Sequence, residues 1–165
     1  MPKVQRGQDL DFLFGALKAA PDAESAKAVE GRIWAVWMVS KSDTANLLMT
    51  RVRTAVEAKK LDLAVELLDK IVLLRPDYVE AWNRRATIHY MRKDFTRSIE
   101  DIRQTLAREP RHFGALAGLG MIMQELGEDK RALEVYRKLI EINPQMPRIP
   151  ALIKSLSEKV EGRDI

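Results

Sequence analysis

Residues 115–144 read ALAGLGMIMQELGEDKRALEVYRKLIEINP, and this stretch decides how the rest of the chain is interpreted. In its second half Leu133, Tyr136 and Leu139 recur three residues apart, which places them on one face of an α-helix. The stretch ends at Pro144, which cannot continue a helix because proline lacks a backbone N–H and clashes with the preceding turn. The pattern therefore predicts two amphipathic helices that end at a proline.

The same proline recurs upstream, since Pro76, Pro110 and Pro144 are each separated by 34 residues. We aligned the three segments with the proline at repeat position 32; the segments are 45–78, 79–112 and 113–146. Position 20 is small and position 24 is large and apolar or aromatic in every copy; the residues are Ala64, Ser98 and Ala132, then Leu68, Ile102 and Tyr136. Three copies in phase indicate an internal repeat.

This pattern resembles the tetratricopeptide repeat, in which W-x2-L-G-x2-Y is followed by A-x3-F and a proline. Position 4 holds Leu48, Trp82 and Leu116, whereas position 7 departs from the pattern with Arg51 and Arg85 in the first two copies. The resemblance implies an all-α fold, a tetratricopeptide solenoid (an α–α superhelix) of about three repeats with an N-terminal helical pair and a C-terminal capping helix.

The expected organisation has three parts. Residues 1–43 contain a short tail and the N-terminal helical pair, which is a degenerate repeat or a cap. Residues 44–146 contain the three repeats, and residues 147–165 contain the capping helix and a tail. A lone helical hairpin cannot bury both of its apolar faces, so the hairpins are expected to stack on one another.

Several local signals predict how the helices begin and pack. Asp22 and Asp77 are expected to cap the helices that follow them, with Glu80 completing a capping box after Asp77. Small residues at positions 8 and 20 are expected to let paired helices approach closely. Pro150 suits the first turn of the capping helix, which is expected to cover the last repeat with Leu152, Leu156 and Val160.

Composition narrows the class of protein further. The chain has 165 residues, 46% of them hydrophobic, and no cysteine, which excludes disulfides and thiolate chemistry. Its longest apolar stretch, IWAVWMV at 33–39, is shorter than the roughly 20 residues that span a bilayer. The first residues do not read as a signal peptide, and no transmembrane segment is predicted.

The residues for catalysis or cofactor binding are sparse. His89 and His112 have no second ligand at helical spacing, and no nucleophile or zinc-protease motif is present. His89 lies at position 11, an aromatic packing position in the family, which favours a core role. We therefore expect a non-enzymatic protein without a cofactor or metal.

The family resemblance also implies a ligand groove lined by the first helix of each repeat. We expect the groove to hold a peptide or helix of a partner protein in a scaffold or adaptor role. The candidate peptide-binding residues are Asn46, Met49, Arg53, Val56, Asn83, Thr87, Tyr90, Met91, Ala117, Met121 and Gln124. In this set methionines offer adaptable apolar contacts, and Tyr90 and Asn83 offer an aromatic anchor and backbone hydrogen bonds.

Some family members bind the acidic C-termini of heat-shock chaperones through a clamp of Lys, Asn and Arg side chains. At the corresponding positions this chain has Met49, Arg53, Arg84, Gly114 and Gly118, so that clamp is absent. The residue types suit a partly apolar peptide or helix instead.

Two other functions remain open at this stage. The chain could be a structural module that forms a homodimer through its terminal helices. Trp34 and Trp37 are expected mainly to cover the end of the solenoid, and a homodimer contact is the alternative for them. A nucleic-acid function is less favoured. The net charge is +4, and the surplus lies mainly in 79–112, but its basic residues are interleaved with acids.

Arg51 and Arg85 have two possible roles. Their stems pack while their guanidiniums pair with carboxylates of an adjacent helix, or they contact a bound anion. Phrases such as ANLLMTR, AWNRRAT and PRHFGALAGLG are similar to small exported repeat proteins of alphaproteobacteria. This resemblance implies the bacterial periplasm, with the cytoplasm as the other location.

Overall fold

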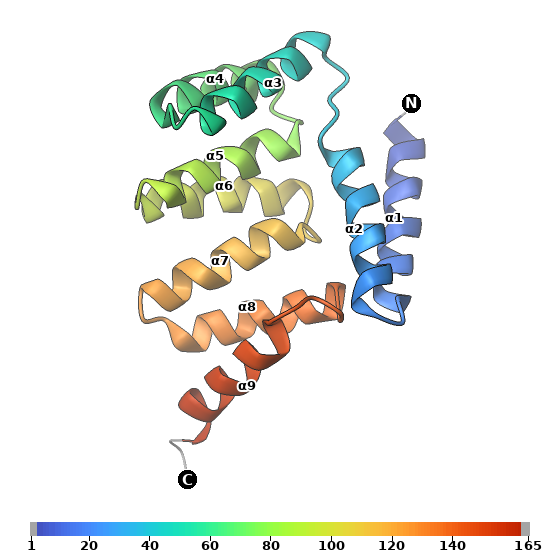
Figure 1. Ribbon diagram of the computed structural model, residues 1–165, viewed down its shortest axis with the longest axis vertical. Helices are drawn as coiled ribbons and strands as arrows, with labels where there is room; N and C mark the ends of the chain where they lie inside the picture. Colours follow the sequence, from blue (N-terminus) through green and yellow to red (C-terminus); the bar gives the residue numbers. More distant parts are fainter. Residues whose placement is uncertain (1–2, 163–165) are drawn as a thin grey trace. The chain divides into compact units, whose positions relative to one another are not determined.

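The computed structural model describes residues 3–162, with side chains from residue 6 onward, and this part of the chain forms nine α-helices and no β-strand (Figure 1). The helices are α1 (Lys3–Ala19), α2 (Ala23–Trp37), α3 (Asp43–Glu57), α4 (Leu61–Leu74), α5 (Val79–Met91), α6 (Phe95–Arg108), α7 (Phe113–Glu125), α8 (Asp129–Ile142) and α9 (Ile149–Val160). The predicted all-α fold class is confirmed. None of these helices is both long enough and apolar enough to cross a bilayer.

The three hairpins α3–α4, α5–α6 and α7–α8 turn in the same way. The residue at repeat position 15 has a positive φ in each turn: 59° at Lys59, 61° at Lys93 and 77° at Gly127. Left-handed backbone is costly for residues with a Cβ, and only the third copy has glycine at this position. The shared turn geometry at 34-residue intervals supports the alignment of the three copies.

The chain forms two compact units, residues 37–115 and residues 1–36 together with 116–165. In the unit of residues 37–115, α3 pairs with α4 and α5 pairs with α6, while α4 also packs against α5. Its core joins α3, α4 and α5 through Ala45, Met49, Val52, Ala55, Ala64, Leu67, Leu68, Ile71, Val72, Tyr78, Ala81 and Ile88.

Small residues hold paired helices close together, as the repeat pattern predicts. In the second repeat the hydroxyl of buried Ser98 donates to the carbonyl of Ala86 at 2.7 Å, which joins α6 directly to the backbone of α5. Ala64 and Ala132 occupy the position of Ser98 in the other repeats and are completely buried. Larger side chains at these sites would force the helices apart.

The unit formed by residues 1–36 and 116–165 joins the two ends of the sequence. The Asn143 side chain donates to Glu30, and Gln145 Nε2 donates to the carbonyl of Ala20 at 3.3 Å. The turn after α8 therefore contacts α2 and the loop before it, although more than 110 residues separate them. The contact between the N-terminal helices and the turn after α8 was not predicted.

At the other side of this unit, α9 packs on α8 as expected for a capping helix. Pro150 lies in its first turn, and Leu156 is buried. Arg137 on α8 donates to Ser157 at 3.3 Å and to Glu161 at 2.8 Å, which adds polar contacts to this packing.

One predicted cap is confirmed and one is wrong. Asp22 caps α2, since its carboxylate accepts from the N–H of Ser25 at 2.7 Å. By contrast, Asp77 does not cap α5, which begins at Val79 without a side-chain cap. The turn after Pro76 is one residue longer than predicted, and the Asp77 carboxylate accepts two hydrogen bonds from Arg75 at 2.8 and 2.9 Å.

We expect Gly120→Ala to lower the free energy of unfolding by about 1–3 kcal/mol, although alanine favours helices. A Cβ on Gly120 would lie 2.3 Å from Cε1 of Tyr136, whose ring is buried and whose hydroxyl donates to Gln124 at 2.6 Å. The ring cannot move away without losing this contact. Urea denaturation followed by circular dichroism measures the change.

Gly31→Ala is the matched control, because Gly31 also lies inside a helix and its Cβ would meet no atom within 4 Å. We expect this control to be neutral or stabilising. Equal stability changes in the two variants would contradict the close approach of α7 and α8.

Candidate functional site

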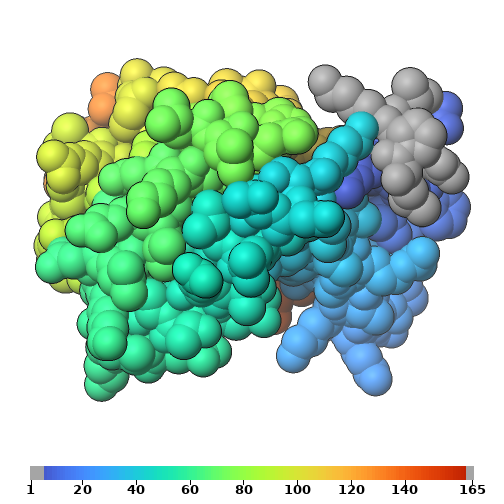
Figure 2. Space-filling view, turned by 90° about the horizontal axis from the view of Figure 1, so that it is seen from above, coloured from blue at the N-terminus to red at the C-terminus, as the bar shows by residue number. Residues whose placement is uncertain are grey.

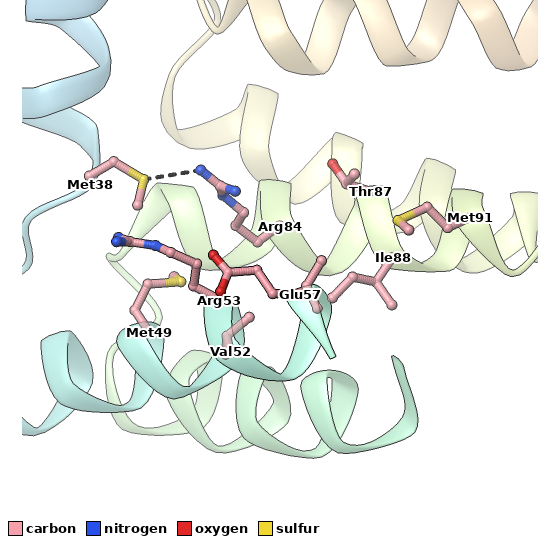
Figure 3. A pocket seen from close by; sticks show the side chains of 10 residues that line it. Met38, Met49, Val52, Arg53, Glu57, Arg84, Thr87, Ile88 and Met91 are labelled. Atoms are coloured by element: carbon pink, nitrogen blue, oxygen red, sulfur yellow. Dashed lines mark hydrogen bonds between the residues drawn. The ribbon is translucent and has the colours of Figure 1, made fainter. Parts of the chain in front are cut away.

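A hollow of about 110 Å³ opens between α3 and α5 in the unit of residues 37–115 (Figure 3). Ten side chains line it: Met38, Met49, Val52, Arg53, Val56, Glu57, Arg84, Thr87, Ile88 and Met91. Nine of them come from the first helices of the first two repeats, and Met38 comes from the segment before α3. We call this feature the α3–α5 hollow.

The base of the α3–α5 hollow is apolar. Met49, Val52 and Ile88 are buried there, and they belong to the core that the two repeats share. Met91 is 50% exposed and lies at the opposite end from Met38 (Figure 3). Flexible methionines at both ends can adapt to apolar side chains of different shapes.

Two arginines border this apolar base. Arg53 on α3 and Arg84 on α5 extend toward Met38 from opposite helices (Figure 3). Arg84 donates through Nε to Glu80 at 3.0 Å and through Nη2 to the sulfur of Met38 at 3.4 Å, which fixes its guanidinium. Arg53 is exposed, and Glu57 lies one helical turn after it. The border of the hollow is therefore mixed in charge, with two cations and one anion.

Met38 is held in place by the segment around it. The Tyr78 hydroxyl donates to the carbonyl of Met38. Two residues later, the N–H of Ser40 donates to Asn46 Oδ1 at 2.8 Å, and Asn46 Nδ2 donates to the carbonyl of Ser40 at 3.0 Å. These contacts tie residues 38–40 to α3 and to the start of α5.

A buried polar network supports Arg84 from below. Glu80 and His112 are both completely buried, and His112 Nε2 lies 3.1 Å from Glu80 Oε2. The other ring nitrogen, Nδ1, accepts from the N–H of Ala115 at 3.0 Å, so it carries no proton. The Nε2–H of His112 therefore donates to Glu80. Asn83 also donates to Glu80, at 3.1 Å.

Trp37 covers this network. Its indole stacks on the His112 ring with centroids 4.1 Å apart and an interplanar angle of 10°. It also contacts the ring of Phe113 at 5.2 Å. Trp37 is thus a buried packing residue, and its burial excludes the alternative interpretation of this side chain as an exposed dimer contact.

A second hollow, of about 350 Å³, is polar and is lined by Val65, Asp69, Arg85, His89, Arg97, Glu100 and Asp101. Arg85 donates to both oxygens of Asp101 at 2.9 Å and to Asp69 at 2.9 Å. Hydrogen bonds to Asp101 raise the pKa of Arg85, which stays charged. Arg85 therefore pairs with carboxylates of α4 and α6, as one of the two predicted interpretations requires. Arg51, at the same repeat position, is exposed.

His89 gives this unit a pH-dependent stability. Burial lowers the pKa of His89, and the nearby Asp101 carboxylate only partly opposes this effect. The ring takes up a proton more readily in the unfolded chain than in the folded one. This group therefore does not reduce the free energy of unfolding above pH about 6.5, the ordinary pKa of histidine. The free energy of unfolding should decline as the pH falls below that value, until the lowered pKa is reached.

The variant His89→Phe tests this expectation, because it removes the titrating group and keeps an aromatic ring at position 11. Urea denaturation at a series of pH values from about 8 to 5 should show a smaller loss of stability in the variant than in the wild type. Identical pH profiles would contradict the assignment to His89.

The arginines of residues 79–112 are engaged with neighbouring groups. Carboxylate partners lie within 4.0 Å of Arg84, Arg85, Arg92, Arg97, Arg103 and Arg111. Arg108 donates to the carbonyl of Pro76 and lies over the Trp82 ring, 4.7 Å from its centroid. Six arginines of this segment therefore have a carboxylate partner, and Arg108 has a carbonyl and an aromatic partner.

The structure brings five of the eleven predicted peptide-binding residues into the α3–α5 hollow: Met49, Arg53, Val56, Thr87 and Met91. Asn46 and Asn83 instead hold the 38–40 segment and Glu80, and Tyr90 stacks on Phe95 at 5.8 Å. Ala117, Met121 and Gln124 lie on α7 in the other unit, where Gln124 accepts from Tyr136.

Five lining residues are not among the eleven predicted binding residues: Met38, Val52, Glu57, Arg84 and Ile88. Met38 precedes the first repeat, so the 34-residue period gives no information about it. Val52 was assigned to helix packing at repeat position 8, and Ile88 was not singled out, although buried side chains can also form the base of a hollow. Arg84 was considered only as a basic residue, because the sequence does not show that it contacts Met38.

Among the described residues, no cluster of three or more His, Asp or Glu side chains is arranged to hold a metal.

Comparisons with known proteins agree with this fold. A family model described as tetratricopeptide repeat matches residues 49–102 and 94–147. A TPR repeat-containing protein of Rhizobium etli is 37% identical over 155 residues, which cover 94% of this chain and 76% of that protein.

Two solved structures share the fold at low sequence identity. The first TPR domain of Spaghetti (RPAP3), bound to the HSP90 peptide SRMEEVD, has a TM-score of 0.68 and 18% identity, covering 73% of this chain and 96% of that one. The MamA protein has a TM-score of 0.66 and 21% identity, covering 97% of this chain and 80% of that one.

Proposed function

Because this chain belongs to the tetratricopeptide repeat family, whose repeats are protein-interaction modules, we propose that it is a non-catalytic adaptor that holds a segment of a partner protein in the α3–α5 hollow. The observation that carries this proposal is the apolar base formed by Met49, Val52 and Ile88, which opens to the surface between two arginines. An apolar cavity with a few fixed polar groups is the usual form of a binding site.

The side chains around the hollow indicate the chemistry of the bound segment. The hollow is small, at about 110 Å³, and its base is apolar. Arg53 is the more available of the two cations, because Arg84 already donates to Glu80 and Met38. We therefore expect an apolar residue with a carboxylate close to it, placed so that the carboxylate meets Arg53.

A peptide-bound domain of the same fold supports a peptide ligand, but the ligand is expected to differ. The Spaghetti domain holds a peptide that ends in EEVD. In this chain Met49, Gly114 and Gly118 stand where chaperone-binding members carry polar clamp residues. A partly apolar segment fits these residues better than a strongly acidic C-terminus.

The variant Arg53→Glu tests the proposal. The tagged full-length chain is incubated with lysate of native cells, and the captured proteins are quantified by mass spectrometry. We expect the partner to be lost from Arg53→Glu, since the reversed charge repels the carboxylate. Lys70→Glu, an equal charge change at an exposed site on α4 outside the hollow, should retain it. Retention of the same proteins by Arg53→Glu would rule out the α3–α5 hollow as the binding site.

A periplasmic location stays a prediction from the resemblance. Fractionation of native cells, with sequencing of the native N-terminus of the protein, tests it.

A further inference from the structure

The first helix of the first repeat, α3, exposes a face whose counterpart on α5, the first helix of the second repeat, is buried. On α5 the residues at positions 3 and 10, Ala81 and Ile88, are 0% and 2% exposed, because they belong to the core shared with α3 and α4. On α3 the same positions hold Leu47, which is 57% exposed, and Thr54, which is also exposed. The face of α3 that should meet a preceding hairpin is therefore uncovered.

The charge at position 7 indicates what would cover this face. On α5 this position holds Arg85, and the preceding hairpin supplies Asp69 to it at 2.9 Å. On α3 it holds Arg51, which is exposed. Arg85 therefore meets a carboxylate of the preceding hairpin, in addition to its two hydrogen bonds to Asp101 on α6. Arg51 presents the same group toward solvent.

The end of α4 adds to the open face. In the second repeat, Arg108 at position 30 reaches back to the carbonyl of Pro76, in the turn after the preceding hairpin. Leu74 holds that position in the first repeat and is 48% exposed. Atoms of α3 and α4 face the viewer in Figure 2 (cyan to green), which shows this side of the hairpin. Leu47, Arg51, Thr54 and Leu74 define what we call the α3 face.

We infer that the α3 face docks a helix of a partner protein that presents a carboxylate between small or aliphatic residues, in the way that α4 presents Asp69 and Val65 to α5. Leu47 and Leu74 supply apolar area, and Arg51 supplies a cation with five donors that suits a carboxylate. The occupant is acidic because the internal precedent, Asp69 against Arg85, is an ion pair.

A second copy stacked head to tail does not provide this chemistry. In the third repeat the position of Asp69 is taken by Arg137, which already pairs with Glu161 at 2.8 Å. α9 also packs on α8 at the end of the array, so a stacked copy would not present a helix in the register of α4 to α3. The proposed occupant is therefore another protein.

The test uses a synthetic stapled helix as the probe. It carries valine and aspartate four residues apart, in the register of Val65 and Asp69, on an alanine and glutamine background with a fluorescent label. Its binding to the full-length chain is followed by fluorescence anisotropy at low salt. We expect saturable binding that Arg51→Glu weakens about tenfold or more, because the reversed charge repels the aspartate.

A charge swap and a matched control make the result specific. A probe with lysine in place of the aspartate should bind Arg51→Glu more tightly than the wild type. Arg103→Glu, an equal change at an exposed arginine of α6, should leave the affinity unchanged. Circular dichroism melts confirm that each variant is folded.

Three results would overturn the inference. The first is no saturable binding of the aspartate probe below about 1 mM, which corresponds to roughly 4 kcal/mol of binding free energy. The second is an equal effect of Arg51→Glu and Arg103→Glu. The third is a concentration-dependent dimer in sedimentation velocity that Arg51→Glu abolishes, since this would make a second copy the occupant.

Discussion

Replacing Glu80 with alanine should lower the free energy of unfolding by about 3–5 kcal/mol, the cost of removing one member of a buried charged network. Glu80 accepts hydrogen bonds from Asn83, Arg84 and His112. Alanine would leave the Nε2–H of His112 without an acceptor in a site that water does not reach, because both residues are completely buried.

Urea denaturation measured by circular dichroism gives the size of this loss. Glu80→Gln is the informative second variant, because it keeps the shape and one acceptor while removing the charge. We expect it to cost less than Glu80→Ala but more than an exposed pair, which contributes about 1 kcal/mol or less. A loss below about 1 kcal/mol in Glu80→Ala would contradict the network.

Leu68→Ala should cost about 2–5 kcal/mol, because it removes a large side chain from a packed interior and leaves a cavity. Leu68 is completely buried in the core that joins α3, α4 and α5. It also holds repeat position 24, where Ile102 and Tyr136 are equally buried in the other copies.

Leu73→Ala on the same helix provides the control, because Leu73 is 85% exposed. The same chemical change there should alter the free energy of unfolding by about 0.5 kcal/mol or less. Urea denaturation of both variants compares the two positions directly. A similar cost at Leu68 and Leu73 would show that α4 does not bury the face that the repeat pattern assigns to the core.

Local patterns in the sequence predicted the fold well. Proline cannot continue a helix beyond its first turn, and the spacing of Pro76, Pro110 and Pro144 therefore marked where each hairpin stops. Close packing needs small side chains, so the repeat positions of Ser98 and Gly120 were enough to predict that both lie at helix–helix contacts. These features depend on contacts within one repeat, and such contacts recur at the same positions in each copy of the sequence.

Contacts between distant residues could not be predicted in this way. Glu80 fits a capping box by its spacing, yet it turns inward to meet His112, which lies 32 residues later. The N-terminal helices contact the turn after α8 through Glu30 and Asn143, which no repeat position relates. Such contacts depend on tertiary packing, and packing overrides a local preference of about 1 kcal/mol.

The repeat pattern predicted part of the candidate site, and the rest depends on contacts that the pattern does not show. Groove positions taken from the family identified Met49, Arg53 and Met91, because those positions face the neighbouring first helix. Family positions could not show that Asn46 and Asn83 are already bonded within the chain. A polar side chain at a groove position is available to a ligand only if the fold does not use it.

Site-directed photocrosslinking tests the central claim, that the α3–α5 hollow holds a partner segment, most directly. A photoreactive amino acid replaces Met91 at the mouth of the hollow, or replaces Leu126 outside it; both side chains are 50% exposed. On irradiation in native cells, we predict that position 91 crosslinks to a defined partner peptide and that position 126 does not. Crosslinking of the same peptide with equal yield from both positions would contradict the account.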